Sequence, residues 1–205
     1  MEQRWTLHIQ DFGKVKEANI RISPLMLFVG DNNSGKSYVM SLLWGVLTVG
    51  KTLFPKEPPK SKTYKNCEAL LIEKMPSHFQ ITEEEAPIFL NWFNDILSQK
   101  KNELVQRVFR TPFDIGSLSL HHYERKKPLE IKFEEVDSLE GRRFSSGAHY
   151  VRIPYTATSI KQKSERYRMI KYICWKLLMD QLTSPLFPAG GSVHRMTPGE
   201  ALYLP

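Results

Sequence analysis

Cysteine and long apolar runs are both scarce in this 205-residue sequence. Its two cysteines, Cys67 and Cys174, lie far apart and form no C-x-x-C pair. This spacing argues against a disulfide framework or a cysteine-ligated zinc site, and it is typical of a reducing compartment. The longest apolar stretch, residues 39–49, is interrupted by polar and small residues. It is shorter than the roughly 20 residues that cross a bilayer. We therefore expect a cytoplasmic protein with no membrane span.

Metal-ligand patterns are also lacking. None of the six histidines pairs with another histidine or cysteine at a typical ligand spacing. His121 and His122 fall in an alternating stretch, which places them on opposite faces of a strand. Positive charge, by contrast, is in excess, because 29 Lys and Arg residues face 22 Asp and Glu residues for a net charge of +7. That excess favours contact with polyanions such as nucleotides or nucleic acid, and an ordinary solvated basic surface is the alternative.

The N-terminal third predicts strands followed by a helix. Residues 5–9 and 15–22 alternate between apolar and polar side chains, and the turn at 11–14 joins them into an antiparallel hairpin. Residues 25–29 are apolar on both faces, which is typical of a central strand covered by helices on both sides. Residues 37–47 have apolar side chains around most of a helix and predict a helix buried over most of its circumference.

The remainder predicts a helical insertion and a second set of strands. Residues 51–65 contain three prolines and five lysines, which predict an exposed loop or linker. A helix is expected over 81–108, where Thr82 precedes three glutamates as an N-cap with an acidic first turn. Further elements are expected as follows: strands at 117–123 and 129–136 joined by the basic turn 124–128, a short strand at 150–153, a helix at 161–182, a loop at 184–198 and the start of a strand at 201–205.

One motif carries chemistry. The residues Gly30, Asp31, Asn32, Asn33, Ser34, Gly35, Lys36 and Ser37 match the phosphate-loop pattern G-x-x-x-x-G-K-[ST] at every fixed position. The two glycines let successive backbone N–H groups converge on phosphate oxygens, and the following helix points its positive end at them. We expect Lys36 to contact the β- and γ-phosphates, and Ser37 to ligate Mg²⁺. The next helical residue, Tyr38, completes the expected nucleotide contacts.

The order of elements before the loop resembles a known class. Gln10-Asp11-Phe12-Gly13 ends a first strand, and two alternating strands precede the phosphate loop. This arrangement resembles the ATPase heads of the ABC-type superfamily, particularly the SMC, RecF and OLD-like AAA ATPases. Leu202-Tyr203-Leu204-Pro205 is also similar to the opening of a Leu-Pro-Ala-Ser-Arg segment in some bacterial AAA ATPases, several of them in antiphage defence systems.

The resemblance implies an α/β fold of P-loop NTPase type, in which residues 1–205 form a partial ATPase domain. Residues 1–50 supply the first strands, the loop and the first helix, about 66–110 form a helical insertion, and 111–205 complete the lobe. It further implies ATP and Mg²⁺ as cofactors, Lys36 as the catalytic residue and ATP sandwiched in a homodimer or with a partner ATPase head. DNA repair or antiviral defence, with nucleic acid as a partner, follows from the same resemblance. The turn at 12–14 lies near the adenine in related heads, and a core role for Phe12 is the alternative.

Several parts of such an ATPase are not apparent in the sequence. In that class, hydrolysis uses a Walker B strand, four apolar residues followed by Asp and Glu, and a Leu-Ser-Gly-Gly signature loop. Residues 70–73 are the best match to a Walker B strand, but they have only one acidic residue and are better explained as one turn of a helix. Residues 144–148 faintly resemble the signature loop, but they are better explained as an ordinary flexible loop. The glutamines Gln80, Gln99 and Gln106 are candidates for the family's Mg²⁺-reaching glutamine, without a recognisable context. We therefore expect that this chain is an N-terminal fragment, a truncated gene product or a split protein, and that it binds nucleotide more readily than it hydrolyses it.

Two other functions remain open from the sequence. A compact P-loop phosphotransferase complete in this chain would take lid arginines from Arg142, Arg143, Arg166 and Arg168. A non-catalytic module would use the loop as a nucleotide-dependent switch for protein or nucleic-acid partners. The basic stretches at 125–127, 142–143 and 161–171 are the candidate phosphate contacts for a nucleic acid, with a solvated helix face as the alternative.

Overall fold

The computed structural model describes residues 3–23 and 26–183. The chain divides into two compact units, and each is described by itself. Among the described residues, unit 1 comprises 3–54, without 24–25, together with 94–124 and 179–183. Unit 2 comprises 55–93 and 125–178.

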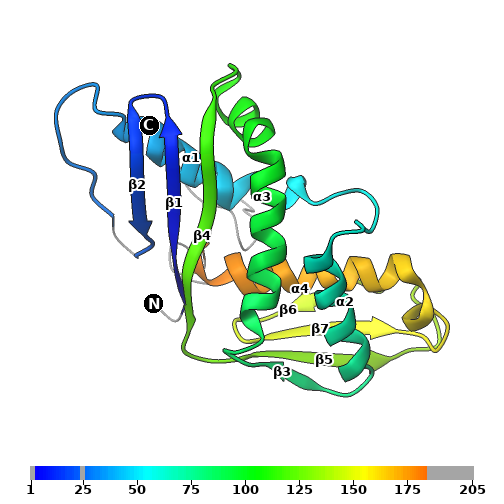
Figure 1. The fold of residues 1–205 in the computed structure, drawn as a ribbon. Helices are drawn as coiled ribbons and strands as arrows, with labels where there is room; N and C mark the ends of the chain where they lie inside the picture. The colour runs from blue at the N-terminus through cyan, green and yellow to red at the C-terminus, as the bar shows by residue number, and fades with distance from the viewer. Residues whose placement is uncertain (1–2, 24–25, 184–205) are drawn as a thin grey trace. The chain divides into compact units, whose positions relative to one another are not determined.

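Unit 1 contains a three-stranded sheet in the order β2-β1-β4 (Figure 1). Strands β1 (Gln3–Phe12) and β2 (Val15–Arg21) pair antiparallel, with Leu7 opposite Ile20, so the predicted hairpin is confirmed. Strand β4 (Ile115–Arg125) lies on the other side of β1. The alternation in β1 has the expected consequence, because Trp5, Leu7 and Ile9 are fully buried.

The helices of unit 1 pack closely. The predicted first helix is α1 (Lys36–Thr48), and η1 (Gly50–Leu53) follows it. The long helix α3 (Ala86–Phe109) contributes its residues from Asn94 onward. A Cβ atom on Gly45 would lie 2.3 Å from Cγ2 of Val108, so only glycine permits this approach of α1 to α3. The prediction that α1 is buried over most of its circumference is only partly right, because Val39, Leu42, Leu43 and Val46 are buried whereas Tyr38 and Met40 are exposed.

Unit 2 contains a four-stranded mixed sheet, all of one further helix and most of another. The sheet order is β3-β5-β7-β6. Its strands are β3 (Phe79–Ile81), β5 (Leu129–Glu135), β6 (Ser145–Ser146) and β7 (Tyr150–Tyr155), and only the β5–β7 pairing is parallel. Helix α2 (Lys62–Lys74) precedes β3, while η2 (Ser159–Lys161) leads into α4 (Lys163–Thr183). The stripe expected in α4 is buried as predicted: Tyr167, Ile170, Ile173, Cys174, Leu177 and Leu178.

The predicted central strand at 25–29 is not a strand where the structure describes it. Residues 26–29 have no strand assignment, and the side chains of Leu27 and Val29 are 84% and 79% exposed. A strand apolar on both faces is stable only between neighbouring strands and covering helices. Among the described residues, no strand pairs with this segment. Leu25 itself lies outside them.

Several predicted boundaries shift. The strands expected at 117–123 and 129–136 exist, but β4 and β5 belong to different sheets. The helix expected from Ile81 begins at Ala86, because Ile81 pairs with Leu129. The backbone N–H of Thr82 donates to the Glu85 carboxylate at 3.0 Å, which is the reciprocal half of a capping box. The linker at 51–65 contains η1 and the start of α2. The loop and strand expected at 184–198 and 201–205 lie outside the described residues.

Candidate functional site

The loop between residues 30 and 35 has a tightly curled backbone. Gly30, Asn33 and Gly35 all have positive φ angles, of 146°, 66° and 94°. The N–H of Ser34 donates to the carbonyl oxygen of Asp31 at 3.3 Å, which closes a turn inside the loop. Residues 30–34 are exposed. The sequence therefore produces an exposed curved backbone of the kind that holds an anion.

Gly35 joins this loop to α1 and has two reasons to be glycine. Its φ of 94° lies in the left-handed region, and a Cβ atom there would lie 2.7 Å from Cγ2 of Val15. The first helical hydrogen bond runs from the N–H of Val39 to the carbonyl oxygen of Gly35 at 3.0 Å. No side chain caps this helix end, and its first turn contains no acidic residue. The N–H groups of the first turn and the positive end of the helix dipole are thus directed toward the loop.

The Lys36 side chain closes over the loop. Its ammonium nitrogen donates to the carbonyl oxygen of Gly30 at 2.7 Å, to the carbonyl oxygen of Asp31 and to Oγ of Ser34 at 3.1 Å. A cation therefore lies beside the curved backbone and the uncapped helix end. Ser37, the next residue, is exposed on the first turn of α1. All the loop residues predicted from the sequence are thus contiguous around one positively polarised surface.

An aromatic cluster lies beside the first turn of α1. Phe12, Tyr38, Phe109 and Phe113 have ring centroids 5.5 to 6.5 Å apart, and the Tyr38 ring stacks on that of Phe109 at an interplanar angle of 16°. Phe12 is fully buried, so its side chain takes the core role that the sequence left as an alternative. Tyr38 is 42% exposed and is the most exposed ring of the cluster, since Phe109 and Phe113 are half-buried. The only sequence signal for this cluster was a tyrosine directly after Ser37.

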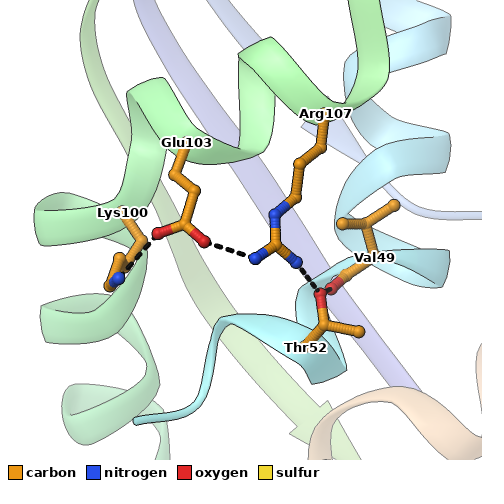
Figure 2. Close-up of polar contacts among 5 residues, drawn as sticks. All are labelled: Val49, Thr52, Lys100, Glu103 and Arg107. Carbon is orange, nitrogen blue, oxygen red and sulfur yellow. Dashed lines mark hydrogen bonds and ion pairs between the residues drawn. The ribbon is translucent and has the colours of Figure 1, made fainter.

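A polar network holds the far end of α1 (Figure 2). Arg107 of α3 donates to the hydroxyl of Thr52 and to the carboxylate of Glu103, as Figure 2 shows. The Thr52 hydroxyl in turn donates to the carbonyl oxygen of Val49 at 2.7 Å. Lys100 lies 2.6 Å from the other Glu103 oxygen, and hydrogen bonding to Lys100 lowers the pKa of that carboxyl below its ordinary value. Together with the Gly45 contact, this network attaches α1 to α3 behind the loop.

The residues considered for other roles lie elsewhere. The Walker B imitation at 70–73 is a turn of α2, as expected, with Ile72 half exposed. The stretch at 144–148 contains β6, which pairs with β7, so the ordinary-loop prediction is only partly right. Gln80 lies on β3, where it contacts Glu130, whereas Gln99 and Gln106 are exposed on α3.

Two of the four arginines suggested for a lid are engaged, Arg142 and Arg143 are exposed, and both cysteines are buried. Arg166 pairs with Glu68 at 3.3 Å, and Arg168 lies 4.5 Å above the Phe144 ring. Both cysteines are free thiols, and burial raises the pKa of Cys67 to about 12. Over residues 3–23 and 26–183, no cluster of three or more His, Cys, Asp or Glu side chains is arranged to hold a metal ion.

A family model for the AAA ATPase domain matches residues 6–179, which include the loop, the aromatic cluster and both sheets. The chain belongs to the AAA ATPase domain family. Membership supports nucleotide binding by a P-loop NTPase, and the mixed α/β architecture of this AAA domain is compatible with it. No curated protein and no solved structure matches the chain. Within the described part of this AAA domain, no helix has the length and hydropathy needed to traverse a bilayer.

Proposed function

We propose that this AAA ATPase domain binds ATP with Mg²⁺ through residues 30–38. The observation that carries the proposal is the position of the Lys36 ammonium beside a curled, exposed backbone and an uncapped helix end. The phosphates would be held by backbone N–H groups from the following residues: Gly30, Asp31, Asn32, Asn33, Ser34, Gly35, Lys36, Ser37 and Tyr38. Lys36 would contact the β- and γ-phosphates and neutralise charge in any phosphoryl transfer.

The residues present fit both groups. An anion at the N-terminus of α1 would meet free donors and no competing carboxylate in the first turn. Lys36 could exchange its contacts with loop carbonyl oxygens for stronger charge-assisted bonds to phosphate. For Mg²⁺, the Ser37 hydroxyl is one hard oxygen ligand, and phosphate oxygens and waters would supply the others. With Mg²⁺ bound, the site gains a charge that neutralises the phosphates.

A second polypeptide surface would complete the catalytic site. The best Walker B imitation in the sequence forms a helical turn and does not end a strand, so it does not fit the role of the carboxylate that orients water. If each head supplies only part of the site, ATP would lie between two subunits, in a homodimer or with a partner ATPase head. The net charge of +7 supports contact with a polyanion such as nucleic acid, and the ATPase would act on DNA or in antiphage defence.

A calorimetric titration with ATP, ADP and AMP, with and without Mg²⁺, tests the proposal. We expect affinity to fall in that order, because Lys36 and Mg²⁺ act on the β- and γ-phosphates. Binding without turnover supports a nucleotide-binding lobe that needs its partner. Phosphate transfer to a small acceptor by the isolated chain would favour a compact phosphotransferase with Arg142 and Arg143 in its lid. Tight ATP binding without hydrolysis, unchanged when a partner protein is added, would favour a non-catalytic switch module.

Ser37→Ala should remove most of the Mg²⁺ dependence of ATP binding. The hydroxyl is exposed on the first turn of α1 and would be the chain's own ligand to the metal. We expect Mg²⁺-dependent affinity to fall by about tenfold, with the affinity measured in EDTA almost unchanged. Ser41→Ala, four residues later on the same helix, is the matched control. Equal Mg²⁺ dependence in wild type and Ser37→Ala would contradict the assignment.

A further inference from the structure

Two lysine-rich segments, about a hundred residues apart in the sequence, meet in unit 2. The first includes the end of the linker and the start of α2, and the second includes η2 and the start of α4. Six of their side chains are exposed, and we call them the six-lysine patch: Lys56, Lys60, Lys62, Lys65, Lys161 and Lys163. The sequence predicted only an exposed linker for the first segment, and neither segment belongs to the proposed nucleotide site.

Aromatic and polar contacts bring these segments together. The rings of Tyr64 and Tyr167 are 5.4 Å apart, and the Tyr167 hydroxyl donates to the carbonyl oxygen of Pro55 at 2.7 Å. Arg166 pairs with Glu68 at 3.3 Å across the same junction. Figure 1 shows α2 beside the N-terminal half of α4, in agreement with these contacts.

The lysines are neighbours of the residues that make this junction. Lys56 adjoins Pro55 in the chain, and Lys62 and Lys65 lie on either side of Tyr64. Lys163 precedes Tyr167 by four residues, which is about one turn of α4. The patch is therefore a product of tertiary packing and not of sequence proximity.

Negative charge does not neutralise the patch. Of the nearby acids, Glu68 pairs with Arg166 and Glu165 lies 3.0 Å from Arg168, which leaves Glu57 against six lysines. Helices α2 and α4 both begin here, so their positive dipole ends add to the field. A cluster of positive charges with few opposing acids creates a positive local potential, which attracts a polyanion.

We propose that the six-lysine patch binds the phosphodiester backbone of a nucleic acid. Lysine is a point charge without planar hydrogen-bonding geometry, so the contacts would position the backbone without reading the bases. The aromatic rings at the junction, Tyr64 and Tyr167, are buried and offer no face for stacking. Of the exposed large apolar side chains among the described residues, Ile72 lies on α2 but in its last turn, and none lies in the linker end, η2 or the start of α4, which favours nucleic acid over an acidic membrane surface. The inference rests on the proposed nucleic-acid role but not on ATP binding.

Fluorescence anisotropy with a labelled duplex of about 20 base pairs tests the proposal across about 50 to 200 mM salt. The patch variant replaces Lys56, Lys62, Lys65 and Lys163 with glutamine. The control replaces four exposed cations outside the patch and outside the other basic stretches considered for nucleic acid, namely Lys16, Arg21, Lys51 and Arg152, also with glutamine. Each variant loses four charges and falls from +7 to +3, so net charge is matched.

The patch variant should lose at least about tenfold in affinity at low salt, and its slope of log affinity against log salt should shrink by about three units. The control should change the slope by less than about one unit. Equal losses of duplex affinity in the patch variant and the control would show that only net charge matters, and would overturn the proposal that the patch is the binding site. No duplex binding by wild type, or patch-dependent binding to anionic lipid vesicles alone, would also overturn it.

Nucleotide binding separates this result from the proposed function. Both glutamine variants should retain wild-type ATP affinity and circular dichroism, because none of the substituted residues lies in the phosphate loop or in α1. Loss of duplex binding with ATP affinity intact supports the patch. A protein that binds ATP normally but never binds duplex fails only this inference, and a protein that binds duplex but not ATP fails only the proposed function.

Discussion

Lys36→Ala should reduce ATP affinity by on the order of 10- to 100-fold. The ammonium lies within 3.1 Å of three loop oxygens, so it is already positioned where phosphate oxygens would compete for it. A hydrogen bond to a charged group contributes about 1.5 to 3 kcal/mol, which corresponds to this loss. Calorimetric titration with ATP in the presence of Mg²⁺ is the measurement, and crosslinking with azido-ATP gives an independent readout.

Lys51→Ala is the matched control for that experiment. Lys51 is exposed on η1 in the same unit and makes the same change in net charge. Its ATP affinity should equal that of wild type. Crosslinking of Lys36→Ala as efficient as that of wild type would contradict the phosphate-loop assignment.

Gly35→Ala should have the second large effect, on both stability and ATP binding. The new methyl group would be in a left-handed conformation and 2.7 Å from Cγ2 of Val15. Left-handed strain costs about 1 to 2 kcal/mol, and overpacking adds about 1 to 3 kcal/mol. Relief by movement of the loop would displace the N–H groups that face the phosphates. We expect a fall of about 2 to 4 kcal/mol in the free energy of unfolding and a loss of ATP affinity.

Two variants separate the causes. Gly141→Ala has a similar φ of 67° but meets no atom within 4 Å, so it should lose stability through strain alone. Adding Val15→Ala to Gly35→Ala removes the clashing methyl groups and should recover part of the loss. Urea denaturation measures both effects. If the double variant loses as much free energy of unfolding as the two single variants added together, contact with Val15 does not cause the loss in Gly35→Ala.

Much of the local structure was predictable because it depends on neighbours in the sequence. The alternation in β1 and the helical stripe of α4 each follow from side-chain periodicity, and both are buried as expected. The helix after the loop was likewise predictable, because its apolar residues recur at helical spacing. The exposed face of α1 could not be predicted from the sequence, because an apolar side chain such as Met40 is buried only if another element covers it.

The strand expected at 25–29 shows the same limit more strongly. Its apolar composition is a local property, but a strand also needs hydrogen-bonding partners on other strands. Leu27 and Val29 are exposed, and no described strand pairs with them. The pairing of β4 was missed for a related reason, because a short basic turn between two strands does not determine whether they share a sheet.

The sequence by itself determined the phosphate-loop motif, its place before a helix and the excess of positive charge, because these are contiguous or additive properties of the residues. Tertiary structure alone decided that Phe12 is buried while Tyr38 is exposed, and that Gly35 is confined by Val15. It also decided that two distant lysine-rich segments form one patch at Tyr64 and Tyr167. Each of these depends on contacts between residues far apart in the chain, which no local periodicity specifies.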